Sequence, residues 1–194
     1  MALAYSNITI ELKEILLKNR PKELFDVSAK STVPVLCINN TTVIDESLDI
    51  MQWALNQHDP ENWISNNLEI QLEMIKVSDN DFKYWLDRYK YYDRFPKYNK
   101  NYYREKCDEY LVKLNIQLEN NRYLLSNKLL LLDIAIFPFV RQFANVDINW
   151  FNDNYQNVSR WLNNLIQSDL YLSVMDKYLE YQYDQEPLII NFNN

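Results

Sequence analysis

The chain of 194 residues contains no glycine, although glycine makes up roughly 7% of an average protein. Walker-type and dinucleotide-binding loops need glycine, because it lets the backbone approach phosphate groups closely. Ordinary nucleotide-binding loops of either kind are therefore excluded. Turn positions with positive φ fall instead to other residues, of which asparagine is the most tolerant. We expect such turns at Asn39-Asn40, Asn66-Asn67 and Asn120-Asn121.

Residues that form disulfides or bind metals are also scarce. The two cysteines, Cys37 and Cys107, lie far apart in the sequence, and His58 is the one histidine. A disulfide framework is not expected from this spacing. Structural zinc needs about four clustered Cys or His ligands, so we predict no metal site and interpret His58 as a surface residue.

Basic residues are outnumbered, with 20 Lys and Arg against 27 Asp and Glu and a net charge of -7. This balance argues against nucleic acid or anionic membranes as partners. No apolar stretch approaches the roughly 18 residues of a membrane span, and Met1–Tyr5 lacks the features of a secretion signal. We expect a cytoplasmic protein with neither nucleic-acid nor membrane partners.

The first part of the chain alternates strand and helix signals. Ile8–Lys13 alternates apolar and polar residues, as a half-buried strand does, and Pro21 suits the first turn of a short helix. The apolar run Val33–Ile38 and the segment Thr42–Ile44 predict a hairpin. Apolar residues at helical spacing, preceded by acidic residues, predict a helix over 46–57. The predicted order is β-α-β-β-α.

The rest of the chain reads as helical after a polar linker at 58–67. Residues 69–120 predict two long helices with a break near Phe95-Pro96. Leu129–Phe143 is almost entirely apolar, which is typical of a helix at the centre of a bundle. Two further amphipathic helices are predicted at Val158–Ile166 and Leu170–Tyr181.

Several segments resemble the glutathione transferase family. Thr32–Leu36, followed by Ile44–Ile50, resembles its glutathione-binding signature, and Asp133–Phe143 and Phe82–Tyr91 resemble helices of bacterial members. The resemblance covers nearly the whole chain. It implies an α+β fold: a thioredoxin-like glutathione-binding domain over 1–58, incomplete at its start, and an all-α helical-bundle domain over 68–194.

The resemblance also implies which residues bind glutathione. Pro34 matches the family's cis-proline, which would leave the backbone of Val33 free to pair with the cysteinyl part of glutathione as an added strand. Ser47, near a helix N-terminus, suits the γ-glutamyl carboxylate. Glu46 would receive the ammonium group of the ligand.

A cation is needed for the glycyl carboxylate of glutathione, and Arg20 is our candidate. Lys18 and Lys22 are nearly as plausible. Glu46-Ser47 also has a structural explanation, because this pair is common at helix starts. The Val-Pro pair at the matching distance before it favours the ligand role.

Features of the helical half can be explained in more than one way. In the family, the residue matching Asp133 caps its helix reciprocally with a Ser or Thr three residues earlier, but here that residue is Leu130. Half of the capping device is therefore missing. Tyrosines could line an electrophile pocket, although aromatic side chains on helices more often pack in the core. They are Tyr84, Tyr89, Tyr91 and Tyr92.

Family members begin with a strand and a turn that carries the Ser, Tyr or Cys stabilising the glutathione thiolate. This chain begins at Met1–Ser6, which resembles the end of the family's first helix. Met1 is then either an internal residue of a longer protein or the start of a short protein that has lost catalysis. Losing that strand leaves backbone groups unpaired unless something replaces it. Tyr5 and Ser6 are not expected to act as substitutes, so no catalytic residue is assigned.

The resemblance implies a homodimeric transferase that uses glutathione as co-substrate and transfers it to small electrophiles or reduces mixed disulfides. The alternative is a non-catalytic interaction or regulatory protein with the same fold. A third hypothesis is contact with RNA or another anionic ligand, but interspersed acids favour a solvated helix face. The basic residues concerned are Lys83, Arg88, Lys90, Arg94, Lys97 and Lys100.

Overall fold

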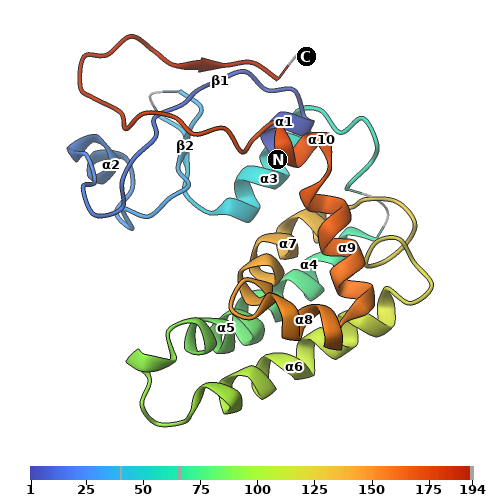
Figure 1. Cartoon of the computed structure of the whole chain (residues 1–194). Helices are drawn as coiled ribbons and strands as arrows, with labels where there is room; N and C mark the ends of the chain where they lie inside the picture. The colour runs from blue at the N-terminus through green and yellow to red at the C-terminus, as the bar shows by residue number, and fades with distance from the viewer. Residues whose placement is uncertain (40, 65–66, 193–194) are drawn as a thin grey trace. The chain divides into compact units, whose positions relative to one another are not determined.

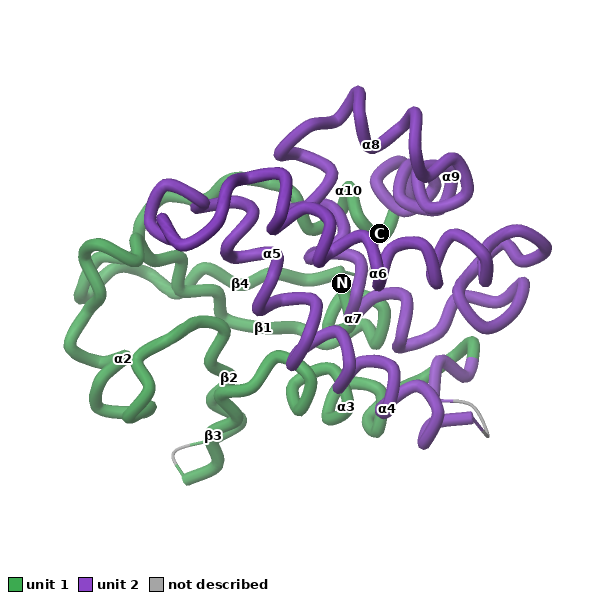
Figure 2. Tube along the Cα trace, turned by 90° about the horizontal axis from the view of Figure 1, so that it is seen from below, with its two compact units in different colours: residues 1–61, 169–194 green, residues 62–168 purple. Residues whose placement is uncertain are grey.

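The computed structural model describes residues 1–39, 41–64 and 67–192 (Figure 1). The chain divides into two compact units, one of residues 1–61 with 169–194 and one of residues 62–168 (Figure 2). The C-terminal segment 169–194 thus groups with the first unit, whereas the sequence pattern placed it in the helical half. No helix in the described ranges is long and apolar enough to cross a bilayer.

The first unit contains the predicted β-α-β-β-α order. In chain order its elements are α1 (Ala2–Tyr5), β1 (Ile10–Glu11), α2 (Lys22–Val27), β2 (Leu36–Cys37), β3 (Val43–Ile44), α3 (Ser47–Gln57), α10 (Asp169–Leu172) and β4 (Ile189–Ile190). Its strands are shorter than the apolar patterns predict. Helices α1 and α3 contact each other, and both bury small or aliphatic side chains, among them Ala4 and Ala54.

The strands of this unit form two antiparallel pairs. Strands β2 and β3 form the predicted hairpin, with Leu36 opposite Ile44. Strand β1 pairs with β4, with Ile10 opposite Ile190 (Figure 1). The sequence pattern did not predict this pairing, and its helix over Leu170–Tyr181 is wrong beyond Leu172. The tail instead runs beside the first strand segment, where its backbone finds hydrogen-bond partners such as Leu12, whose N–H donates to the Leu188 carbonyl at 2.8 Å.

Positive φ angles occur at residues other than the predicted asparagine pairs. Asn40 and Asn66 lie outside the described residues, and no described member of the pairs is among those with positive φ. The positive φ angles belong to Asn7, Ser31, Asn62 and Asp184. Asn7 ends α1, where its N–H donates to the Ala4 carbonyl and the Ile8 N–H donates to the Leu3 carbonyl. This is the Schellman arrangement, which needs a left-handed residue at that position.

All secondary-structure elements described in the second unit are helical. Its elements are α4 (Leu68–Val77), the π-helical turn η1 (Ser78–Phe82), α5 (Lys83–Lys90), the 3-10 turn η2 (Tyr92–Arg94), α6 (Lys100–Gln117), α7 (Leu131–Ala144), α8 (Ile148–Asn154) and α9 (Gln156–Ile166). The predicted break near Phe95-Pro96 falls between η2 and α6. Helix α8 was not predicted as a separate element.

Helix α7 lies in the core of this unit, as its apolar sequence predicts, because most of its side chains are buried. Asp133 is buried near its start and accepts hydrogen bonds from Leu124 N at 3.0 Å, Leu130 N at 3.1 Å and Trp161 Nε1 at 2.9 Å. The Asp133 N–H, which a Ser or Thr side chain at position 130 would accept, donates instead to the Leu130 carbonyl at 3.1 Å. Burial raises the pKa of the Asp133 carboxyl to about 6.

Candidate functional site

The segment before β2 offers free backbone groups. The Val33–Pro34 peptide bond is cis, and Val33 is 47% exposed. Within the described ranges, neither the N–H nor the C=O of Val33 has a hydrogen-bond partner. An extended peptide could pair with these groups in the manner of an added strand.

Helix α3 begins at Ser47, immediately after the β2–β3 hairpin. Ser47 is exposed, and its hydroxyl makes no hydrogen bond to any residue that the structure describes. Glu46 is the N-cap residue, but its side chain does not cap the helix. The first-turn N–H groups of α3 therefore have no acceptor from the N-cap side chain, and the positive end of the helix dipole favours an anion there.

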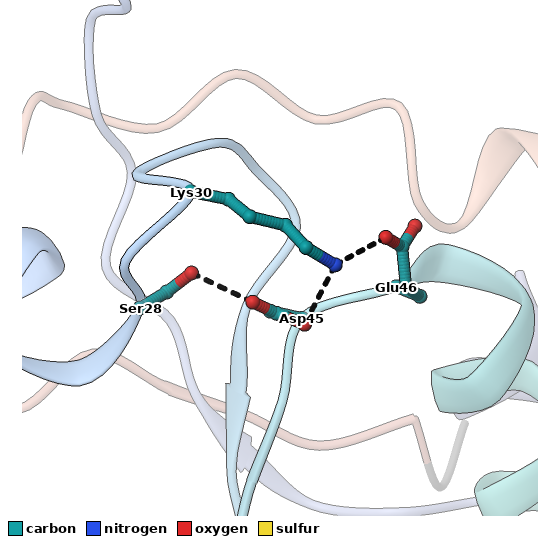
Figure 3. A network of polar contacts seen from close by, with 4 residues as sticks. All are labelled: Ser28, Lys30, Asp45 and Glu46. Carbon is teal, nitrogen blue, oxygen red and sulfur yellow. Dashed lines mark hydrogen bonds and ion pairs between the residues drawn. The ribbon is translucent and has the colours of Figure 1, made fainter.

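The Glu46 carboxylate instead belongs to a polar network with the loop after α2 (Figure 3). Lys30 Nζ donates to the Glu46 carboxylate and to Asp45 Oδ1, the latter at 3.3 Å. Ser28 Oγ donates to Asp45 Oδ2 at 2.8 Å. The Glu46 contact raises the pKa of Lys30, and the Ser28 hydrogen bond, followed by Lys30, lowers the pKa of Asp45. Glu46 thus already holds one ammonium group, with which a ligand ammonium would compete or share the carboxylate.

Arg20 forms hydrogen bonds that hold the loop after α2. Its Nε donates to the Leu17 carbonyl at 3.1 Å, and its Nη1 donates to the Ser31 carbonyl at 2.9 Å. Ser31 has a φ of 50° and donates from Oγ to the Ser28 carbonyl at 3.2 Å. The Arg20 side chain therefore supports the segment that leads to Val33. Its predicted contact with the glycyl carboxylate, and the alternatives Lys18 and Lys22, stay predictions.

The structure adds residues that the sequence motif did not indicate. Lys30, Asp45 and Ser28 connect the loop after α2 with the start of α3, where Glu46 lies (Figure 3). The available signal was position, since Lys30 shortly precedes the Val-Pro pair and Asp45 directly precedes Glu46. Position alone does not predict which carboxylate a flexible lysine side chain contacts.

Tyr5 and Ser6 are poorly placed to activate a thiol. The Tyr5 hydroxyl donates to Asp59 Oδ1 at 2.9 Å and accepts the Glu61 N–H at 2.6 Å. Burial raises the pKa of Tyr5, so its hydroxyl stays protonated and engaged. Ser6 is buried. Across the ranges described, no group of His, Cys, Asp and Glu is arranged to hold a metal ion.

The four tyrosines considered for an electrophile pocket separate into two environments. Tyr89 is buried in the core of the second unit, as an aromatic core residue would be. Tyr84, Tyr91 and Tyr92 are exposed. Tyr84 lines a cavity of about 590 Å³, and Tyr91 lines one of about 380 Å³.

Comparison with protein families gives two matches that together span most of the chain. The model of the glutathione S-transferase N-terminal domain matches residues 1–57. The model of the glutathione S-transferase C-terminal domain matches residues 74–169. The search of curated proteins finds no match.

Solved structures with the same fold include three bacterial proteins. A class Gtt2 glutathione S-transferase of Vibrio parahaemolyticus is 22% identical, with a TM-score of 0.63 over 84% of this chain and 81% of that chain. The bacterial GST BphK, in a ternary complex, is 18% identical, with a TM-score of 0.73 over 89% and 88%. A glutathione S-transferase from Methylobacillus flagellatus with GSH bound is 13% identical, with a TM-score of 0.73 over 88% and 89%. At these identities the likeness establishes the fold.

Proposed function

Because the chain belongs to the glutathione S-transferase family, we propose that its first unit binds glutathione as co-substrate. We further propose transfer of glutathione to small electrophiles or reduction of mixed disulfides, by a homodimer in the cytoplasm. The family membership and the GSH-bound structure of a similar fold support this proposal. The transferase or reductase activity, the homodimer and the cytoplasmic location are proposals that go beyond these two observations.

The start of α3 carries the proposal. Ser47 is exposed at a helix N-terminus without a side-chain cap, which is a favourable place for the γ-glutamyl carboxylate. The neighbouring Glu46 carboxylate already accepts an ammonium group from Lys30, so the same chemistry suits the ligand ammonium. The free backbone groups of Val33 would pair with the cysteinyl part. Arg20, fixed beside Ser31, is our candidate for the glycyl carboxylate.

A titration of the full chain with reduced glutathione, followed by calorimetry, tests this assignment. We expect saturable binding that Ser47→Ala and Glu46→Gln each weaken about tenfold, which corresponds to about 1.4 kcal/mol. Glu109→Gln is the matched control, because Glu109 is also an exposed glutamate paired with a lysine, Lys106, at 2.9 Å. Absence of binding by a chain shown to be folded would refute the proposal.

A non-catalytic glutathione-binding protein is the second candidate function. The observation that favours it is the environment of Tyr5, whose hydroxyl is engaged by Asp59 and Glu61. An assay with an aryl halide electrophile and with a mixed disulfide of glutathione separates the two candidates. Turnover that Ser47→Ala reduces supports the transferase. Tight glutathione binding without turnover of either compound supports the non-catalytic protein.

A further inference from the structure

A second candidate ligand site lies within the helical unit, around the connection between α5 and α6. The cavity of about 590 Å³ is within the range of small-molecule sites. Six aromatic side chains, one proline and three cations line it. They are Tyr84, Trp85, Arg88, Arg94, Phe95, Pro96, Lys97, Tyr98, Tyr102 and Tyr103.

The aromatic wall of this cavity is held in place by contacts among its own members. Tyr98 and Tyr102 stack with ring centroids 4.1 Å apart, and Trp85 meets Tyr102 edge-on at 6.3 Å. The Tyr103 hydroxyl donates to the Phe95 carbonyl at 2.8 Å and accepts the Tyr98 N–H at 3.3 Å. These hydrogen bonds fasten the loop before α6 to the helix itself, so a flat ligand would meet a preformed surface.

Arg88 makes more contacts than the other two cations of the cavity. Its guanidinium carbon lies 3.4 Å from the Tyr84 ring centroid and 4.6 Å from the Phe95 centroid, and its Nη1 donates to the Tyr84 carbonyl at 2.9 Å. Aromatic rings flank the guanidinium, so its remaining N–H groups are preoriented for a planar, two-pronged contact with an oxyanion. Arg94 and Lys97 add two more positive charges to the lining.

Among the residues that the structure describes, the three cations have no acidic partner. No Asp or Glu lines the cavity, and among residues of known placement no carboxylate oxygen lies within 4.0 Å of the side-chain nitrogens of Arg88, Arg94 or Lys97. The nearby Lys83 does have such a partner, Asp79, at 3.3 Å. Stacking on aromatic rings explains where the cations lie, but not why a chain with a net charge of -7 leaves them unneutralised.

We propose that this cavity binds a small planar aromatic phosphate. The ring would pack against Trp85 and the tyrosine wall, and the phosphate would accept hydrogen bonds from Arg88 and the neighbouring cations. A phosphate monoester carries about -1.5 to -2 charges at neutral pH, which suits several cations better than a single carboxylate does. All of its residues belong to the second unit, whereas the residues proposed to bind glutathione belong to the first.

Titration of the full chain with 1-naphthyl phosphate, followed by calorimetry, tests the ligand class. We expect saturable binding, with 1-naphthol and inorganic phosphate each at least about tenfold weaker because each supplies only one of the two recognised groups. Equal affinity for 1-naphthol would show that the cavity recognises only the aromatic ring, and this result would overturn the proposal. Equal affinity for inorganic phosphate, or no binding of the ester, would overturn it as well.

Substitutions locate the binding. We expect Arg88→Gln and Lys97→Gln each to weaken 1-naphthyl phosphate binding about tenfold. Arg122→Gln is the matched control, because Arg122 also lies over a tyrosine ring, that of Tyr123 at 5.4 Å, but outside the cavity. Lys97 is exposed, so its variant remains informative if Arg88→Gln misfolds.

The Ser47→Ala variant should bind 1-naphthyl phosphate as tightly as the unchanged chain does. This control distinguishes failure of the proposed phosphate site from failure of the proposed glutathione site. An equal loss with Arg122→Gln, or full binding by the folded Lys97→Gln variant, would contradict the site.

Discussion

Among single residues, Lys30 contacts the exposed carboxylate of Glu46. Its ammonium contacts both Asp45 and Glu46 (Figure 3), so a ligand ammonium must displace it or share the carboxylate. Exposed ion pairs contribute little to stability, so we expect Lys30→Met to tighten glutathione binding by no more than about fivefold. Calorimetric titration measures this, with Lys106→Met as the control for loss of a lysine paired with a glutamate. Weaker binding would show that Lys30 contacts the ligand instead of competing with it.

Asp133 is the residue for which the structure predicts a pH-dependent stability. Burial raises the pKa of its carboxyl from 3.8 to about 6, so the folded chain binds this proton more readily than the unfolded chain. The contribution of Asp133 to the free energy of unfolding is therefore fully present below about pH 4 and is lost as the pH rises through 6.

The variant Asp133→Asn tests both parts of this argument. Three N–H donors meet the carboxylate, and an amide provides one acceptor oxygen instead of two. We expect a loss of about 1–3 kcal/mol in the free energy of unfolding, larger at pH 4.5 than at pH 7. Urea unfolding at both pH values measures it, with the exposed Asp153→Asn as the control. An equal loss at both pH values would contradict the pKa argument.

Among the secondary-structure elements, local signals sufficed where the element depends on its own residues. The β2–β3 hairpin follows from an apolar run and a turn, and α3 follows from helical spacing after acidic residues. The central position of α7 follows from its uniform apolarity. The sequence pattern alone therefore assigns Glu46 and Ser47 to the start of a helix, and Val33 to the segment that leads into the hairpin.

Pairings across long sequence separations could not be predicted in this way. Strands β1 and β4 come from opposite ends of the chain and pair through backbone groups, which leave no mark on side-chain patterns. The apolar spacing over Leu170–Tyr181 resembles a helix, but the extended tail gains hydrogen bonds beside β1, as where the Tyr181 N–H donates to the Glu14 carbonyl at 2.7 Å. The contacts of Lys30 could not be predicted for a related reason, because they depend on the conformation of a loop with positive φ at Ser31.

The register of the β1–β4 pair predicts different effects of proline substitution at two adjacent residues. Leu12 N donates to the Leu188 carbonyl, and hydrogen-bonded pairs alternate in an antiparallel ladder. The Ile190 N–H therefore points toward β1, and the Ile189 N–H points away. We expect Ile190→Pro to lower the free energy of unfolding by about 1 kcal/mol, with a smaller loss for Ile189→Pro. Urea unfolding and proteolysis of the tail measure the difference. Equal losses would contradict the register.

For the whole molecule, the two compact units each contain one proposed site, which makes their ligands separable. A ligand that binds only the folded form stabilises it by about 2.7 kcal/mol at a concentration 100 times its Kd, and amide exchange slows most where opening of the site is suppressed.

We expect saturating glutathione to slow exchange in residues 28–50 and leave 84–103 unchanged, and 1-naphthyl phosphate to do the reverse. Hydrogen exchange followed by mass spectrometry measures both segments in one sample. At the same ligand concentrations, Ser47→Ala should reduce the first effect and keep the second, and Lys97→Gln should do the opposite. Protection of both segments by either ligand would contradict the assignment of each ligand to the residues of one unit.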